Sequence, residues 1–218
     1  MSIMRFRALS GLLLAPMLLA GCATIQVPMK TEVAKVETDA KIPLRATLLL
    51  PETSRSYRFR GKPESLTGGA RTYEFPLGAE LESVSREAFA QVFQQVDLAQ
   101  EQPDAQRAEI VIVPEIVDFH FRYDQLSHFG IRLDAVSRAR ARVTMSDATG
   151  PVWTYTAESP EARSGSWYFA TNYEEHTAKA SSVALASAIE AIANAAAKAP
   201  ELRKLSERVR SERGPLQP

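Results

Sequence analysis

Few side chains in this sequence have the types and spacing that catalysis or metal binding requires. The three histidines, His120, His128 and His176, follow no H-E-x-x-H spacing or other metal-binding pattern. The sequence contains no G-x-S-x-G, S-x-x-K, P-loop or G-x-G-x-x-G motif. The adjacent pair Glu174-Glu175 stands near an expected helix start, where carboxylates favourably oppose the helix dipole. The sequence therefore predicts a non-enzymatic protein without a bound metal or cofactor.

Three arginines form a candidate binding stripe. Arg138, Arg140 and Arg142 are spaced by two, so the alternation of a strand sends all three to one face, about 6.6–7 Å apart. Such a stripe could bind anionic headgroups, lipopolysaccharide phosphates or an acidic partner. The alternative is a solvated outer face on which the guanidinium groups pair with Asp or Glu of neighbouring strands.

A second candidate is the aromatic run Trp167-Tyr168-Phe169, in an expected loop over 158–172. Exposed aromatic side chains at this density would mark a protein interface. The alternative is a loop that folds back over the sheet, because Trp and Tyr commonly bury their rings and leave a polar tip in water.

The composition is that of a globular protein, with 45% hydrophobic and 24% charged residues. The 26 Lys and Arg residues balance 26 Asp and Glu, which argues against nucleic acid as the main partner. The single cysteine, Cys22, excludes an intramolecular disulfide and any multi-cysteine metal site.

The first residues have the pattern of an export signal. Arg5 and Arg7 precede an apolar stretch over 8–20, which at 13 residues is shorter than the roughly 20 that a membrane-spanning helix needs. At its end stand Leu19-Ala20-Gly21-Cys22, which resemble the lipobox of bacterial lipoproteins.

This resemblance implies that residues 1–21 are a signal peptide, cleaved before Cys22. The thiol would then carry diacylglycerol, and the new amino terminus an acyl chain such as palmitate. Ala23 follows where enterobacterial inner-membrane lipoproteins tend to have Asp, so by resemblance the protein is anchored in the outer membrane, facing the periplasm. The alternative is an ordinary signal peptide that contains a cysteine.

The mature chain divides into three parts. Residues 22–41 are expected to be the lipidated cysteine and a flexible tether, because they show no clear hydrophobic period. Residues 42–200 suit one domain, and 201–218 form a charged helical tail.

Hydrophobic periodicity predicts the elements of this domain. In chain order they are a buried strand (42–50), a helix (77–96), a strand interrupted by Pro114 (108–123), a long hairpin (131–145 with 152–157) and an alanine-rich helix (173–198). This order favours an α+β fold, with a mixed sheet and a long hairpin covered by two main helices on one face.

Parts of this pattern resemble envelope lipoproteins with a fold similar to the TolB amino-terminal domain. The resemblance lies in a helix that begins at Gly78 and ends Phe93-Gln94-Gln95-Val96, the strand Ala108-Glu109-Ile110-Val111-Ile112, the turn Asp147-Ala148-Thr149-Gly150 and the helix over 184–193. Proteins with this outline include activators of penicillin-binding proteins and auxiliary lipoproteins of ABC-type lipid transporters.

These observations lead to two functional expectations. The first is a lipid-anchored accessory or adaptor protein, which binds another envelope component through its sheet edge or aromatic loop in envelope assembly or lipid transport. The second is a direct binder of anionic lipid or lipopolysaccharide through the Arg138, Arg140 and Arg142 stripe.

Overall fold

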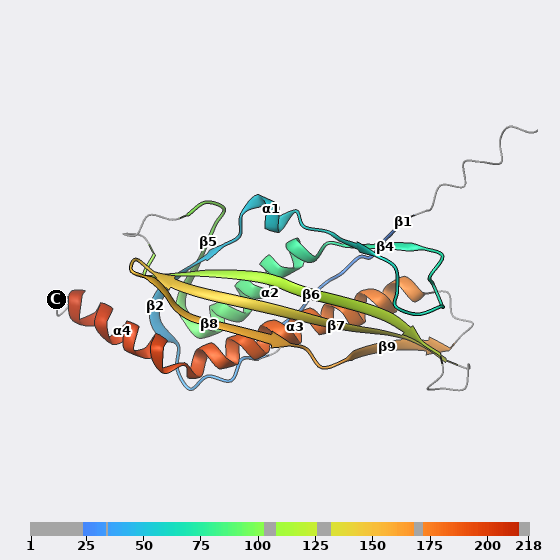
Figure 1. The fold of residues 1–218 in the computed structure, drawn as a ribbon. Helices are drawn as coiled ribbons and strands as arrows, with labels where there is room; N and C mark the ends of the chain where they lie inside the picture. Colours follow the sequence, from blue (N-terminus) through green and yellow to red (C-terminus); the bar gives the residue numbers. More distant parts are fainter. Residues whose placement is uncertain (1–23, 34, 103–107, 126–131, 168–171, 214–218) are drawn as a thin grey trace, which may run out of the picture.

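The computed structural model describes residues 24–33, 35–102, 108–125, 132–167 and 172–213. Two sheets and the helices between them make an α+β fold, as the sequence predicts (Figure 1). The strands are β1 Thr24–Gln26, β2 Ile42–Leu49, β3 Phe59–Gly61, β4 Thr72–Phe75, β5 Phe93–Ala99, β6 Ile110–Asp124, β7 Arg132–Asp147, β8 Gly150–Glu158 and β9 Ala162–Trp167. The helices are α1 Glu52–Arg55, α2 Leu77–Val92, α3 Tyr173–Lys198 and α4 Pro200–Arg213.

The large sheet is mixed and has the order β5-β2-β6-β7-β8, with β9 also paired to β7. Strand β2 runs parallel to β5 and β6, whereas β7 is antiparallel to β6, β8 and β9. The predicted long hairpin is confirmed, because β7 pairs with β8 from Arg140 opposite Glu158 to Asp147 opposite Gly150.

A small sheet of order β1-β4-β3 packs against β6 of the large sheet through an aromatic cluster. The ring centroids of Phe75 and Phe121 lie 4.8 Å apart, and those of Phe59 and Phe119 lie 5.1 Å apart. Offset and edge-to-face contacts of this kind stabilise beyond the area that they bury.

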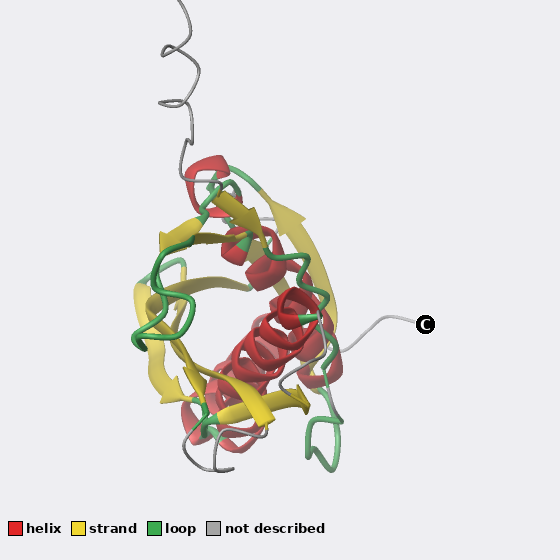
Figure 2. Cartoon of the chain, turned by 90° about the vertical axis from the view of Figure 1, so that its right-hand side faces the viewer, coloured by secondary structure: helices red, strands yellow, loops and turns green. Residues whose placement is uncertain are grey.

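Helices α2 and α3 cover one face of the large sheet, and the strands curve around them (Figures 1 and 2). Among the described helices, only α3 has the length and hydropathy of a membrane span, and most of that window is buried in this core. Its buried side chains are mainly small, among them Ala184 and Ala188, both fully buried. Small side chains let the axis of this alanine-rich helix approach the sheet closely.

The first main helix ends earlier than its hydrophobic pattern predicts. The expected helix over 77–96 stops at Val92, and Phe93 has the extended dihedrals φ −104° and ψ 155°. Residues 93–99 instead form β5, in parallel register with β2 from Ile42 to Leu49. Tertiary pairing overrides the local helical period here, because β2 would otherwise leave one row of backbone groups unpaired.

The expected tether over 22–41 is wrong for the described residues 24–33 and 35–41. Strand β1 pairs with β4, and the following segment (the strap, residues 27–41) lies across α2 and α3. Val27 and Val36 are buried, the Val36 amide donates to Gln91 Oε1 (3.0 Å), and the Glu37 amide donates to Asn194 Oδ1 (2.7 Å). Polar side chains on the helices thus replace the strand pairing that the strap lacks.

The carboxy-terminal segment is helical, as predicted, and it packs on the domain. Leu202 and Leu205 of α4 are buried, and Arg208 forms an ion pair with Asp147 in the turn between β7 and β8.

Candidate functional site

The predicted arginine stripe lies on the outer face of β7, away from the helices. Arg138 and Arg140 are exposed and Arg142 is half-buried, whereas the alternate residues Ala139, Ala141 and Val143 are buried in the core. The alternation therefore places the three guanidinium groups on one face, as the spacing of two predicts.

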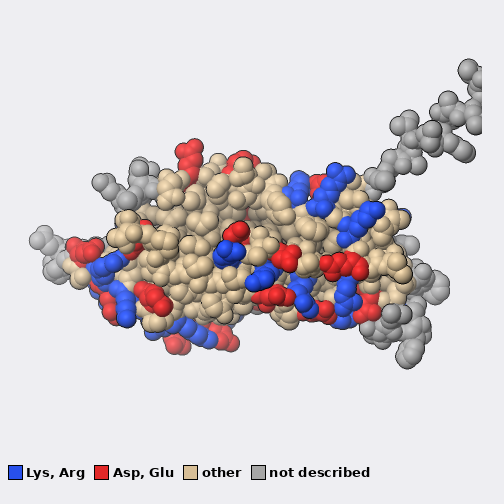
Figure 3. All heavy atoms as spheres, in the orientation of Figure 1, with Lys and Arg blue, Asp and Glu red and all other residues tan. Residues whose placement is uncertain are grey.

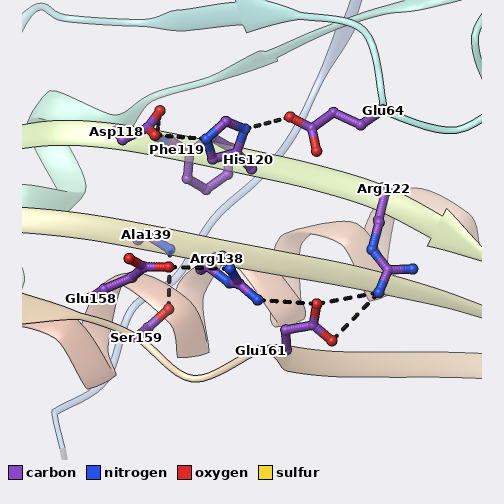
Figure 4. Close-up of polar contacts among 10 residues, drawn as sticks. All are labelled: Glu64, Asp118, Phe119, His120, Arg122, Arg138, Ala139, Glu158, Ser159 and Glu161. Carbon is purple, nitrogen blue, oxygen red and sulfur yellow. Dashed lines mark hydrogen bonds and ion pairs between the residues drawn. The ribbon is translucent and has the colours of Figure 1, made fainter.

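Carboxylates from neighbouring strands meet this stripe. Arg138 lies 3.2 Å from Glu158 and 3.3 Å from Glu161, and Glu161 also binds Arg122 at 3.2 Å (Figure 4). Hydrogen bonds from Arg163 and then Arg122 lower the pKa of the Glu161 carboxyl below its usual value. Glu161 is therefore ionised at neutral pH and offsets the positive charge of this part of the face.

The other two stripe residues differ in their partners. Arg142 lies 3.9 Å from Glu115, at the limit of an ion pair. Within the described residues, no carboxylate forms an ion pair with Arg140, although Asp118 and Glu158 stand opposite it in the register. The outer face of β7 therefore carries both signs of charge. This agrees with the alternative in which the arginines pair with Asp or Glu of neighbouring strands.

A hollow of about 240 Å³ opens on this outer face between β6, β7 and the loop over 62–71. Its polar lining includes Glu64, His120, Arg122, Arg138 and Glu161. Because both signs of charge line it, it has no net preference for an anion.

His120 links two elements at the rim of this hollow (Figure 4). Its Nε2 lies 2.6 Å from Asp118 Oδ2 on β6, and its Nδ1 contacts Glu64 of the loop between β3 and β4. Hydrogen bonds to Asp118 and then Glu64 raise the pKa of the imidazole above 6.5. Across the described part of the chain, no three His, Cys, Asp or Glu side chains are arranged to hold a metal ion.

The predicted aromatic interface is only partly placed. Trp167 ends β9 with its backbone opposite Arg132, while Tyr168 and Phe169 lie outside the described residues. Cys22, the predicted lipidation site, also lies outside them, two residues before β1 begins.

Another aromatic pair, which sequence reasoning missed as a site, stands on β8. Trp153 and Tyr155 stack with ring centroids 5.7 Å apart and an interplanar angle of 10°. They lie opposite Met145 and Val143 of β7, so their rings are on the helix-covered face at its margin, where Tyr155 is 43% exposed. In the sequence, their spacing of two within a predicted strand indicates that the two rings lie on the same face.

Strand β8 is also an edge of the large sheet. Among the described strands it pairs only with β7, which leaves its second row of backbone N–H and C=O groups unpaired along nine residues. The register shift and Pro151 are confined to its beginning, and from Trp153 onward the only charged residue is Glu158. Edge strands that avoid pairing usually carry a central lysine, proline or bulge.

No protein-family model matches this sequence, and no curated protein sequence matches it. Several solved structures share the course of the backbone. A Xanthomonas campestris protein of family model DUF330 is 11% identical, with a TM-score of 0.49 over 87% of this chain and 99% of that one.

A minor lipoprotein from Acinetobacter baumannii is 12% identical, with a TM-score of 0.38 over 72% of this chain and 93% of that one. A PelC variant from Paraburkholderia phytofirmans, solved as a dodecamer, is 12% identical, with a TM-score of 0.34 over 72% and 94% of the two chains. These are similarities of the backbone at low TM-scores, and no residue role is transferred from them.

Proposed function

We propose that this chain is a lipid-anchored, non-catalytic accessory protein of the bacterial envelope. It binds an extended segment of another envelope protein, which adds to the large sheet along β8. The observation that carries this proposal is the open edge of β8 beside the exposed Tyr155.

The free edge of β8 provides the affinity in this mode of binding. An added strand would satisfy the unpaired backbone groups of β8, and main-chain hydrogen bonds of this kind bind a segment with little regard to its sequence. The charges on the outer face of β7 favour strand addition at β8 over anion binding by the arginine stripe, because Arg138 already has two carboxylate partners.

The aromatic pair provides the specificity. The stack of Trp153 on Tyr155 holds the Tyr155 ring in place at the margin of the helix-covered face. Alternate side chains of an added strand would point to this same face, so an apolar residue of the partner would contact the Tyr155 ring.

The anchor at Cys22 sets where this binding takes place. Lipidation of the lipobox cysteine would hold the domain at a periplasmic membrane surface, and the partner would be a protein of envelope assembly or lipid transport. In the Cys22→Ala variant we expect the protein to leave the membrane fraction.

Photo-crosslinking in living cells tests the binding edge. A photoreactive phenylalanine replaces exposed Thr156 on β8, in the full-length, lipidated chain with a carboxy-terminal tag. We expect one discrete adduct, and Tyr155→Lys should remove most of it because a charge at the edge opposes strand addition.

Leu98→Lys is the matched control, because Leu98 lies on β5 at the opposite edge and is also 43% exposed. It should leave the adduct unchanged. An adduct equally sensitive to both variants, or its absence, would contradict the proposal. An adduct of twice the mass of the chain would identify a second copy as the added strand in place of a partner protein.

A further inference from the structure

The small sheet lies at the end of the domain that is nearest in the chain to Cys22, the predicted site of lipidation. Thr24 begins β1 and pairs with Thr72 at the beginning of β4, and Arg60 Nη2 donates to Thr24 Oγ1 at 3.0 Å. Because Cys22 is two residues before Thr24, the chain between them spans at most about 7 Å. A lipidated Cys22 would therefore hold this end of the small sheet directly against the bilayer.

The loop that joins β3 to β4 (the docking loop, residues 62–71) lies at the same end. Strand β4 is parallel to β1, and the first residues of the two strands, Thr72 and Thr24, pair with each other, so the docking loop ends beside the beginning of β1. Figure 1 shows this loop at the end of the molecule where β1 begins.

Contacts with β6 hold the docking loop in place. The Glu64 amide donates to the Phe121 carbonyl (3.0 Å), the Tyr123 amide to Ser65 Oγ (2.9 Å), and Thr67 Oγ1 to Gln125 Oε1 (2.8 Å). At the tip, the Gly69 amide donates to the Leu66 carbonyl at 3.2 Å. The tip is therefore a fixed turn.

Leu66 stands fully exposed on this turn. An isolated exposed leucine is ordinary on a protein surface. This one differs in its position, because the loop holds it at the end of the molecule nearest the predicted lipid.

The segment of the chain that contains Leu66 has more cations than carboxylates. The segment from Arg58 to Glu74 has four cations (Arg58, Arg60, Lys62 and Arg71) and two carboxylates. Glu74 is paired with Arg58 at 3.3 Å, and Glu64 is paired with His120. Among the described residues, no ion pair involves Arg60, Lys62 or Arg71, and Figure 3 shows Lys and Arg side chains gathered where Figure 1 places β1 and β4.

We propose that the docking loop binds the leaflet that carries the lipid anchor, with Leu66 in the boundary between headgroups and acyl chains. Arg60, Lys62 and Arg71 bind the phosphates of anionic phospholipids. Charge attraction and a buried apolar side chain act together at such surfaces. This inference rests on the lipid anchor of the proposed function and does not depend on the β8 edge.

Docking fixes the orientation of the domain on the membrane. With two attachment points, the acyl chains at Cys22 and the docking loop, the domain cannot rotate freely about its anchor. Strand β8 belongs to the large sheet, so its free edge would be presented at a set angle to the bilayer.

Spin labelling of the lipidated protein in vesicles tests this arrangement. Leu66→Cys introduces a labelling site, since Cys22 is the only native cysteine and its sulfur would carry lipid. In vesicles of phosphatidylethanolamine and phosphatidylglycerol, we expect the label at position 66 to be reached by oxygen several-fold more readily, relative to a water-soluble nickel chelate, than a label at Leu98→Cys.

Charge reversal tests the proposed contacts between the cations of the docking loop and the lipid phosphates. Lys62→Glu with Arg71→Glu should return the label at position 66 to the aqueous values of position 98. Reversal of two exposed helix residues, Arg86→Glu with Lys204→Glu, is the matched control and should leave the label at position 66 unchanged.

The outcomes separate this inference from the proposed function. A protein that floats with the vesicles while its label at position 66 stays aqueous would overturn the docking loop and leave the anchor intact. A label that stays in the bilayer after the Lys62 and Arg71 reversal would overturn the phosphate contacts. A mature protein without acyl chains on Cys22, measured by mass spectrometry, would overturn both proposals.

Discussion

At the scale of single residues, His120 is the most informative side chain. It joins Asp118 of β6 to Glu64 of the docking loop, so its charge helps to hold the loop on the sheet. Its place on the polar face of a strand could be predicted from the alternation around it. The approach of Glu64, 56 positions away, could not, because only the packing of the small sheet brings that residue near.

The raised pKa of His120 predicts a pH-dependent stability. Because the folded-state pKa lies above the unfolded value of 6.5, the stabilisation is fully present below about pH 6.5 and is lost as the pH rises through the folded-state pKa. We expect His120→Gln to lower the free energy of unfolding by less than about 1 kcal/mol near pH 5.5, since solvent screens this half-exposed pair, and to have almost no effect near pH 8.5. Urea unfolding at the two pH values measures this.

An NMR titration of the His120 ring provides the control. Asp118→Asn should lower the pKa of His120 more than Glu64→Gln does, because the hydrogen bond to Asp118 makes the larger contribution. A destabilisation by His120→Gln that is equal at both pH values would contradict the electrostatic account.

At the scale of elements, α3 illustrates how a sequence pattern predicts packing. Its small residues predict close contact with a sheet, and Ala180, Ala184 and Ala188 are buried in the structure. For α2 the same reasoning predicts the end of the helix wrongly, because the hydrophobic pattern continues into residues that form β5. The hydrophobic period describes which side chains are apolar, whereas the choice between helix and strand at Phe93 depends on the neighbouring β2.

Enlarging one side chain of α3 tests the close packing. Ala188→Leu adds three carbon atoms at a fully buried position, and we expect it to lower the free energy of unfolding by about 2–3 kcal/mol. Val183→Leu, at a position of the same helix that is 47% exposed, should change it by less than about 0.5 kcal/mol. Urea denaturation measures both, and equal effects would refute close packing as the reason for the alanines.

At the scale of the whole molecule, the strap ties distant parts of the chain together. It follows β1 of the small sheet, passes α2 near Gln91 and reaches the end of α3, where Lys198 lies 3.1 Å from Glu37. From Thr24 onward the described chain packs on the domain, so a force on the predicted anchor at Cys22 would act on the domain directly.

Placing a charge under the strap tests how firmly it is bound. Val36→Asp buries a carboxylate in an apolar site, and we expect a loss of about 2–3 kcal/mol in the free energy of unfolding, with faster amide exchange in residues 27–41. Hydrogen exchange followed by mass spectrometry resolves this segment from β7, whose exchange should change much less.

Lys35→Asp is the control, since Lys35 is the exposed neighbour of Val36. It should leave the exchange of the strap unchanged. Uniformly faster exchange across the whole domain in Val36→Asp would show that the strap and the core unfold together.

The sequence by itself determined the features that depend on local pattern. These are the lipobox-like motif that ends at Cys22, the α+β class, the long hairpin, the alanine-rich helix and the common face of Arg138, Arg140 and Arg142. Each follows from a period of two or 3.6 residues or from a contiguous motif, which neighbouring residues are enough to define.

Only the tertiary structure decided which of these features are available for binding. The carboxylates that pair with Arg138, the docking of the strap, the strand at Phe93–Ala99 and the free edge of β8 all depend on residues far apart in the sequence. The buried side chains of the strap, among them Val27, Met29 and Val36, fit surfaces that other elements provide. Contacts between residues far apart in the sequence depend on how the elements pack, and a local sequence pattern does not predict them.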